Sequence, residues 1–169
     1  MKKLVVLTTG GTIEKIYIEK NGTLVNQGSI IKDHLLNHLR IKHTQIEVVS
    51  LFSKDSLDLM DSDRQQILDS LKRYSSMDYP IIVLHGTDTL EVSARFCWEK
   101  FPEVSVPVVF TGAMRPLGLI DSDAGQNFLE ALTAAKILSA GYYVTFHSGI
   151  FDVPNVTKDR GLGTFVKTT

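Results

Sequence analysis

The sequence predicts an α/β fold, a three-layer sandwich built on a mostly parallel, doubly wound sheet with a β-hairpin flap after the first strand. Short apolar runs alternate along the chain with longer amphipathic segments, the order typical of a parallel sheet with helical crossovers. Most of these runs are continuously apolar, as expected of strands that helices cover on both faces. A short alternating segment around an Asn-Gly pair predicts the hairpin.

Five apolar runs are predicted as buried strands of this sheet. They lie at residues 4–7, 46–51, 81–85, 106–111 and 142–147. All are of a usual strand length, and parallel neighbours of this kind need crossover connections that carry helices. The segments between the runs are therefore expected to contain the helices.

Four helices are predicted between or beside the strands. They run over about 29–39, 62–74, 90–101 and 123–141. Ser29 is expected to cap the first, and Ser62 with Gln65 is expected to form a capping box at the start of the second. Asp123 is expected to cap the fourth helix, and Gly141 to end it.

The segment 14–27 departs from this strand-helix order and predicts the flap. Ile16 and Ile18 alternate with polar residues, and Asn21-Gly22 then supplies a two-residue turn before a second short strand. Alternation places Tyr17 on the face opposite the two isoleucines.

Composition limits the classes of protein that the chain can represent. Its 169 residues, 43% hydrophobic and 22% charged, predict a single domain over 1–169. A net charge of −1 gives no electrostatic basis for a nucleic-acid partner, and no run is long enough to predict a membrane span or a secretory signal. The single cysteine, Cys97, fits a reducing compartment. We therefore expect a cytoplasmic protein with neither nucleic acid nor membrane as a partner.

Two glycine-containing runs follow predicted strands and carry hydroxyl residues. The first is Thr9-Gly10-Gly11-Thr12, and the second is His85-Gly86-Thr87-Asp88-Thr89. Ligands of open α/β sheets bind at the carboxyl ends of the strands, where both runs lie. The first run taken alone also fits a tight turn without a ligand, Thr89 also fits a helix cap, and His85 is interpreted as a structural residue.

A lysine in a third run completes a possible catalytic set. Lys158 follows a polar stretch rich in turn residues and, by itself, fits a solvated side chain. If Thr87 and Asp88 lie beside it, partial desolvation is expected to lower its pKa and make it a base. A threonine hydroxyl needs such a base before it attacks a carbonyl carbon. The combination indicates acyl transfer on an amide.

Metal binding is not expected. His34 and His38 have a spacing that suits a metal on a helix, but no third ligand lies close to them in the sequence. The aspartates at 55, 58, 61 and 63 lack the glycine and terminal glutamate of a calcium loop. We expect neither a metal nor an organic cofactor.

Six runs in this order resemble the amino-terminal domain of the bacterial-type L-asparaginase/glutaminase family. They are Thr9-Gly10-Gly11-Thr12-Ile13, Ser53-Lys54-Asp55, His85-Gly86-Thr87-Asp88-Thr89, Thr111-Gly112-Ala113-Met114-Arg115-Pro116, Ser122-Asp123 with Asn127, and Val156-Thr157-Lys158. The resemblance implies an α/β sandwich with a parallel sheet. It also implies that 1–169 is the family's amino-terminal, catalytic domain, without the carboxyl-terminal domain.

The resemblance implies a catalytic role for five residues. Thr12 would be the primary nucleophile, and Tyr17 on the flap would help to activate it. Thr87, Asp88 and Lys158 would position and deprotonate a hydroxyl or the hydrolytic water. The implied reaction is hydrolysis of L-asparagine to L-aspartate and ammonia through an acyl-enzyme.

The same resemblance implies the substrate-binding residues. Ser53 and Asp88 would hold the α-carboxylate and α-ammonium of the amino acid, and backbone N–H groups near Gly11 and Thr87 would stabilise the oxyanion. The carbonyl of Ala113 would accept from the side-chain amide. Lys54 stands where the family often has glutamine; a cation there would pair with the α-carboxylate, or would repel the substrate ammonium if it swung inward.

Two alternative functions remain open at this point. One is hydrolysis of glutamine or another aspartyl amide, and the other is a non-catalytic amino-acid-binding or regulatory module on the same scaffold. Without the second domain, a homodimer or homotetramer is expected to close the site.

Overall fold

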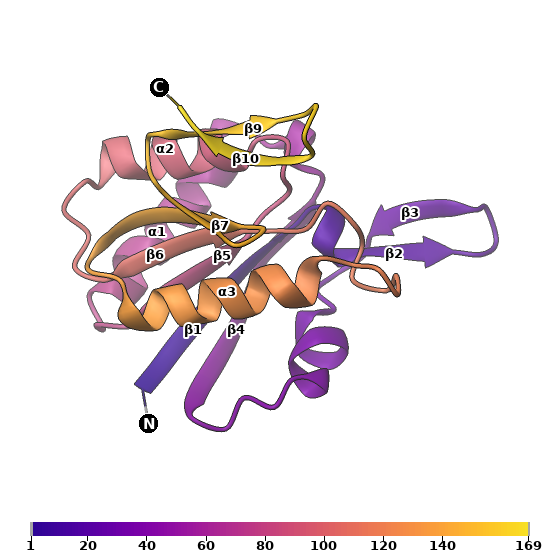
Figure 1. Ribbon diagram of the computed structural model, residues 1–169, viewed down its shortest axis with the longest axis horizontal. Helices are drawn as coiled ribbons and strands as arrows, with labels where there is room; N and C mark the ends of the chain where they lie inside the picture. The colour runs from indigo at the N-terminus through magenta and orange to yellow at the C-terminus, as the bar shows by residue number, and fades with distance from the viewer. Residues whose placement is uncertain (1, 169) are drawn as a thin grey trace.

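The computed structural model describes residues 2–168 and contains a six-stranded, mostly parallel sheet (Figure 1). The strand order is β4-β1-β5-β6-β7-β8. Bounds are β1 Lys2–Gly10, β4 Thr44–Lys54, β5 Ile81–Leu84, β6 Pro107–Thr111, β7 Gly141–Phe146 and β8 Gly149–Asp152. All neighbours pair in parallel except β8, which runs antiparallel to β7. The five predicted strands are confirmed, and β8 is an addition.

Two hydrophobic cores cover the two faces of the sheet. Helices α1 (Asp61–Ser75) and α2 (Leu90–Lys100) pack on one face, and α3 (Ala124–Ile137) packs on the other (Figure 1). Successive residues of β1 divide between the cores: Val5 faces α1 and α2, whereas Val6 faces α3. Both faces of this strand are buried, which explains its continuous apolar run. The predicted three-layer α/β fold is confirmed.

The first predicted helix has a different backbone form. One π-helical turn, η2 (Ile31–Leu35), is followed by a 3-10 turn, η3 (Leu36–His38). Ile31 and Leu35 are buried, and the chain is already extended at Leu39. A helix this short is not stable by itself, so the packing of these two side chains determines whether its turns are α, π or 3-10. The prediction of a regular α-helix over 29–39 was wrong.

The predicted capping box of the second helix was also wrong. Ser62 and Gln65 are exposed, and the Asp63 carboxylate instead accepts the N–H of Met60 at 2.9 Å. Asp63 is buried and also accepts from Lys54 at 2.7 Å. Because this ion pair fixes its carboxylate at the helix start, Asp63 takes the capping role.

The predicted ends of the fourth helix need one correction. Asp123 occupies the N-cap position of α3, but its carboxylate accepts backbone N–H groups of the loop after β6 rather than those of the helix. The helix ends at Ile137, and Gly141 begins β7 with a φ of 151°. Gly141 therefore does not end the helix.

Two hairpins lie outside the main sheet. The predicted flap is formed by β2 (Lys15–Ile18) and β3 (Thr23–Asn26), with Ile18 opposite Thr23, so its connection is longer than the predicted Asn-Gly turn. The second hairpin is formed by β9 (Val156–Asp159) and β10 (Thr164–Lys167). Figure 1 shows this second hairpin beside α2. It lies near the C-terminus of the sequence, whereas the flap lies near the N-terminus. Within 2–168, no helix is long and apolar enough to cross a membrane.

Candidate active site

At the carboxyl ends of β1 and β5, the backbones of two glycines, Gly11 and Gly86, lie in close contact. A Cβ atom on Gly11 would lie 2.4 Å from the Gly86 Cα atom, and Gly11 has a φ of 78°. Strands β1 and β5 are direct neighbours in the sheet, so the residue that follows each glycine projects from the same edge. These residues are Thr12 and Thr87. The glycines therefore allow two hydroxyl-bearing segments to meet.

We expect Gly11→Ala to lower the free energy of unfolding by about 3 kcal/mol or more. Alanine adds the cost of a backbone conformation that essentially only glycine adopts, about 1–3 kcal/mol, and a collision with the Gly86 backbone. Gly28→Ala is the matched control, because Gly28 has a φ of 75° with nothing within 4 Å of an added Cβ. Chemical denaturation of both variants measures the difference, and equal losses would contradict the close-contact explanation.

Lys158 joins the second hydroxyl run at this edge. Its Nζ atom donates to Thr87 Oγ1 at 2.7 Å and to Asp88 Oδ1 at 3.0 Å. Only 11% of the Lys158 side chain is exposed, and Thr87 is buried. Arg160, which the sequence did not indicate, donates to the same Asp88 oxygen at 2.6 Å. The hairpin β9–β10 thus brings two cations to one carboxylate.

The electrostatics of this cluster keep its carboxylate ionised. The hydrogen bond from Lys158 is the main cause that lowers the pKa of Asp88, and Arg160 adds to it. An ionised Asp88 in turn holds the Lys158 side chain against Thr87. The sequence predicted that Thr87, Asp88 and Lys158 lie together, and they do.

His85 lies behind the same run and fits the structural interpretation. Its ring is fully buried, with Nδ1 2.8 Å from the Gly86 carbonyl oxygen and Nε2 2.9 Å from Ser93 Oγ. Burial lowers its pKa to about 4, so the ring is neutral near pH 7. Thr89 occupies the N-cap position of α2, but its hydroxyl does not cap the helix and donates instead to the Ser56 carbonyl.

Thr12 lies in the 3-10 turn η1 (Thr12–Glu14), directly after β1. It is partly buried, and no hydrogen bond to another described residue engages its hydroxyl. The buried carboxyl of Glu14 accepts the N–H of Gly10 at 2.9 Å, and burial raises the pKa of Glu14. Tyr17 is 62% exposed on the flap, and within 2–168 no hydrogen bond joins it to Thr12. Its activating role stays a prediction.

The predicted substrate-binding residues differ in their surroundings. The Ser53 hydroxyl is buried and has no hydrogen-bond partner among the described residues, so it is a polar group open to a ligand. Lys54, by contrast, is bonded to Asp63 on α1, and its role as a ligand of a substrate carboxylate stays a prediction. Gly11 donates its N–H to the Lys54 carbonyl at 2.8 Å. Ala113 is buried beside α3.

A second polar network, formed by Asp123 and Asn127 together with two residues that the sequence did not indicate, His147 and Thr164, connects to the hairpin that carries Lys158. His147 Nε2 lies 2.9 Å from Asp123 Oδ2, and its Nδ1 lies 3.1 Å from Thr164 Oγ1 on β10. Buried Asn127 donates to the same Asp123 oxygen and accepts the N–H of His147. The network connects the start of α3 with β10.

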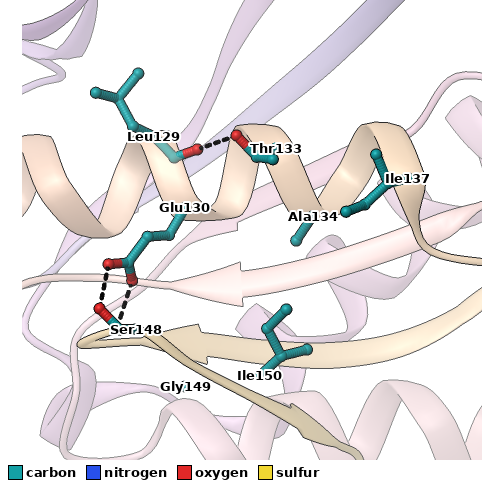
Figure 2. A pocket seen from close by; sticks show the side chains of 8 residues that line it. All are labelled: Leu129, Glu130, Thr133, Ala134, Ile137, Ser148, Gly149 and Ile150. Atoms are coloured by element: carbon teal, nitrogen blue, oxygen red, sulfur yellow. Dashed lines mark hydrogen bonds between the residues drawn. The ribbon is translucent and has the colours of Figure 1, made fainter.

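An apolar groove of about 420 Å³ lies between α3 and β8 (Figure 2). Leu129 and Ile137 on the helix and Ile150 on the strand border it and are exposed. Figure 2 shows Glu130 at one end, where its carboxylate accepts the N–H and the hydroxyl of Ser148. None of the predicted catalytic or substrate-binding residues lines the groove.

Comparison with known proteins gives consistent matches. The family model described as "Asparaginase, N-terminal" matches residues 3–164. The L-asparaginase of Thermococcus kodakarensis is 30% identical over 168 residues, which cover 95% of this chain and 49% of that protein. The 60 kDa lysophospholipase of Mus musculus is 35% identical over 105 residues, which cover 62% of this chain and 17% of that protein.

Solved structures give the same result. The thermostable L-asparaginase from Thermococcus kodakarensis superposes with a TM-score of 0.80 at 29% identity, covering 98% of this chain and 51% of that one. The match thus includes nearly all of this chain but only about half of the longer L-asparaginase.

Proposed function

The chain belongs to the asparaginase family, through the match to its amino-terminal domain, and from this premise we propose that it hydrolyses L-asparagine to L-aspartate and ammonia. Residues 1–169 act in this proposal as one catalytic domain in the cytoplasm. The reaction needs no metal or cofactor, because a threonine hydroxyl supplies the nucleophile and a lysine supplies the base.

The contact of Lys158 with Thr87 and Asp88 is the observation that carries this proposal. Three side chains that bear an amine, a hydroxyl and a carboxylate meet at 2.7 and 3.0 Å from positions about 70 residues apart in the chain. A lysine held mostly out of water against a hydroxyl suits proton transfer. This arrangement supports acyl transfer better than a binding module, which has no need of a base.

In the proposed mechanism, Thr12 Oγ attacks the side-chain amide carbon of asparagine. A C–O bond forms and the C–N bond breaks, the nitrogen leaves with an added proton as ammonia, and an ester of Thr12 remains. Thr87 and Lys158 then pass a proton from water to Thr12 Oγ, while the water oxygen attacks the ester carbon, the bond to Thr12 breaks and aspartate is released. Tyr17 assists the first step when the flap covers the site.

Substrate recognition in this proposal uses groups around the same sheet edge. The unpartnered hydroxyl of Ser53 binds the α-carboxylate, and Asp88 binds the α-ammonium. Because the Gly11 N–H is bonded to the Lys54 carbonyl, a neighbouring backbone N–H serves the oxyanion in this proposal, and the Ala113 carbonyl accepts from the amide. Lys54 reaches the α-carboxylate only by leaving Asp63. A second copy of the chain, in a homodimer or homotetramer, closes the site.

Ammonia release from a panel of amides tests the proposal. Purified protein is expected to hydrolyse L-asparagine with a higher kcat/KM than L-glutamine or isoasparagine, as compared by initial rates. A preference for glutamine or isoasparagine would favour the alternative amidohydrolase. Calorimetric binding of L-aspartate with no turnover of any amide would overturn the catalytic proposal and favour the binding module.

A further inference from the structure

Glu14 is a buried titratable residue that the proposed mechanism does not use. Its side chain is fully shielded from water, and burial is the main cause that raises the pKa of its carboxyl. The polar groups that oppose this rise are all uncharged and belong to Ser29, Gly10, Thr8 and Ile30. A buried carboxyl without a cation is unfavourable unless its oxygens find hydrogen-bond donors. The position of these donors therefore shows what the carboxyl holds together.

The first donor is a backbone group at an irregular point of β1. The register of β1 against β4 shifts between Thr8 and Gly10, and the N–H of Gly10 donates to Glu14 Oε2 at 2.9 Å. Gly10 is buried, so its N–H would lack a partner without this carboxyl. Glu14 thus fixes the backbone at the end of β1.

The other groups place the carboxyl between the two ends of the flap. Glu14 directly precedes β2, whereas Ser29 and Ile30, which face its carboxyl, follow β3. The Ser29 hydroxyl also accepts the N–H of Ile31 at 3.5 Å, at the start of η2. One side chain therefore links the end of β1 to the chain on both sides of the flap.

The turn η1, which carries Thr12, is held both before and after this residue. Before Thr12, Gly11 lies against Gly86 and donates its N–H to the Lys54 carbonyl at 2.8 Å. After Thr12, the N–H of Glu14 donates to the Gly11 carbonyl at 3.2 Å, and the Glu14 carboxyl makes the contacts described above. The Thr12 hydroxyl forms no hydrogen bond with another described residue, so the backbone of η1 determines where it lies.

We propose that Glu14 is a positioning residue whose carboxyl holds η1 so that Thr12 Oγ is aligned with the amide carbon of the substrate. The proposal rests on the function assigned above, in which Thr12 is the nucleophile. Because Glu14 is fully buried, it acts through the turn and not by contact with the substrate. A displacement of about 1 Å at a reacting atom slows a reaction about 10²-fold, so loss of the carboxyl lowers kcat more than it weakens binding.

Steady-state kinetics with L-asparagine test this role. Glu14→Ala is expected to lower kcat about 10²-fold and to leave KM nearly unchanged. Glu14→Gln keeps an oxygen that accepts the N–H of Gly10 and is expected to recover most of the rate. Glu130→Ala is the matched control, because it removes a carboxylate that also accepts a backbone N–H at 2.9 Å, from Ser148, away from the candidate site. This control is expected to keep the wild-type kcat.

The folded state of each variant is checked by its thermal unfolding midpoint and by calorimetric binding of L-aspartate. If Glu14→Ala does not fold, Glu14→Asp takes its place, because it keeps the charge and shortens the reach toward Gly10. A folded variant of either kind with the wild-type kcat, or an equal loss of kcat in Glu130→Ala, would overturn the positioning role.

Backbone hydrogen exchange tests the inference without turnover. The N–H of Gly10 is expected to exchange faster in Glu14→Ala than in the wild type, relative to the N–H groups of β5, and to stay protected in Glu14→Gln and Glu130→Ala. Unchanged exchange at Gly10 would overturn the hold of Glu14 on the turn even if asparagine is hydrolysed. If the wild type hydrolyses no amide, the proposed function fails, whereas faster exchange confined to Glu14→Ala would still support this hold.

Discussion

Replacing Lys158 by methionine is expected to lower the kcat for ammonia release from L-asparagine about 10³-fold. The Nζ atom lies 2.7 Å from Thr87 Oγ1, and the side chain is mostly shielded from water, so solvent does not easily replace this base. Methionine keeps the length of the side chain and removes only the amine. Rates at saturating asparagine measure the effect.

The fold of this variant is expected to persist because Asp88 keeps its bond to Arg160. Its thermal unfolding midpoint, measured in parallel, therefore separates loss of chemistry from loss of structure. Lys167→Met, on the same hairpin, is the control and is expected to retain the full rate. A kcat for Lys158→Met within tenfold of the wild type would contradict its role as the base.

Thr12→Ala is expected to lower the same kcat by at least about 10³-fold, because it removes the proposed nucleophile. Thr12 comes directly after Gly11, which lies close to Gly86. The Thr12 hydroxyl forms no hydrogen bond with another described residue. Alanine leaves the backbone of the turn unchanged, so substrate binding is expected to persist. Thr12→Ser restores a hydroxyl and is expected to recover part of the rate.

The control for this change is Thr23→Ala, an exposed threonine of the flap that is expected to keep the wild-type rate. Calorimetric binding of L-aspartate to Thr12→Ala shows whether the site remains formed. Undiminished hydrolysis in Thr12→Ala would assign the attacking hydroxyl elsewhere, and Thr87→Val would then be the variant expected to lose activity.

The sheet was predictable because burial on both faces leaves a direct pattern in the sequence. The run 81–84, for example, is continuously apolar, and its strand β5 lies in the centre of the sheet. Strand β8 and the hairpin β9–β10 have no such pattern. They pair through backbone hydrogen bonds at an edge or outside the main sheet, where side chains need not be apolar.

The candidate site was predictable where it follows the ends of strands. Thr87 and Asp88 follow β5, so their position at the sheet edge comes from the topology alone. Arg160 and His147 were missed because each is a single polar residue in a turn, with partners that only the folded chain brings close. The partner of Lys54 is likewise a result of how α1 packs beside β4.

Lys158 lies on a hairpin outside the six-stranded sheet, so its contact with Thr87 can open without unfolding of that sheet. Thr12 and Thr87 follow β1 and β5, whereas the Lys158 amine reaches Thr87 from β9, 71 residues further along the chain. Native proteins open in partial units whose free energies differ. Undocking of this hairpin would withdraw Lys158 from Thr87 and would also take Val156 and Phe165 out of the core around α1 and α2, whereas the core around α3 would stay intact.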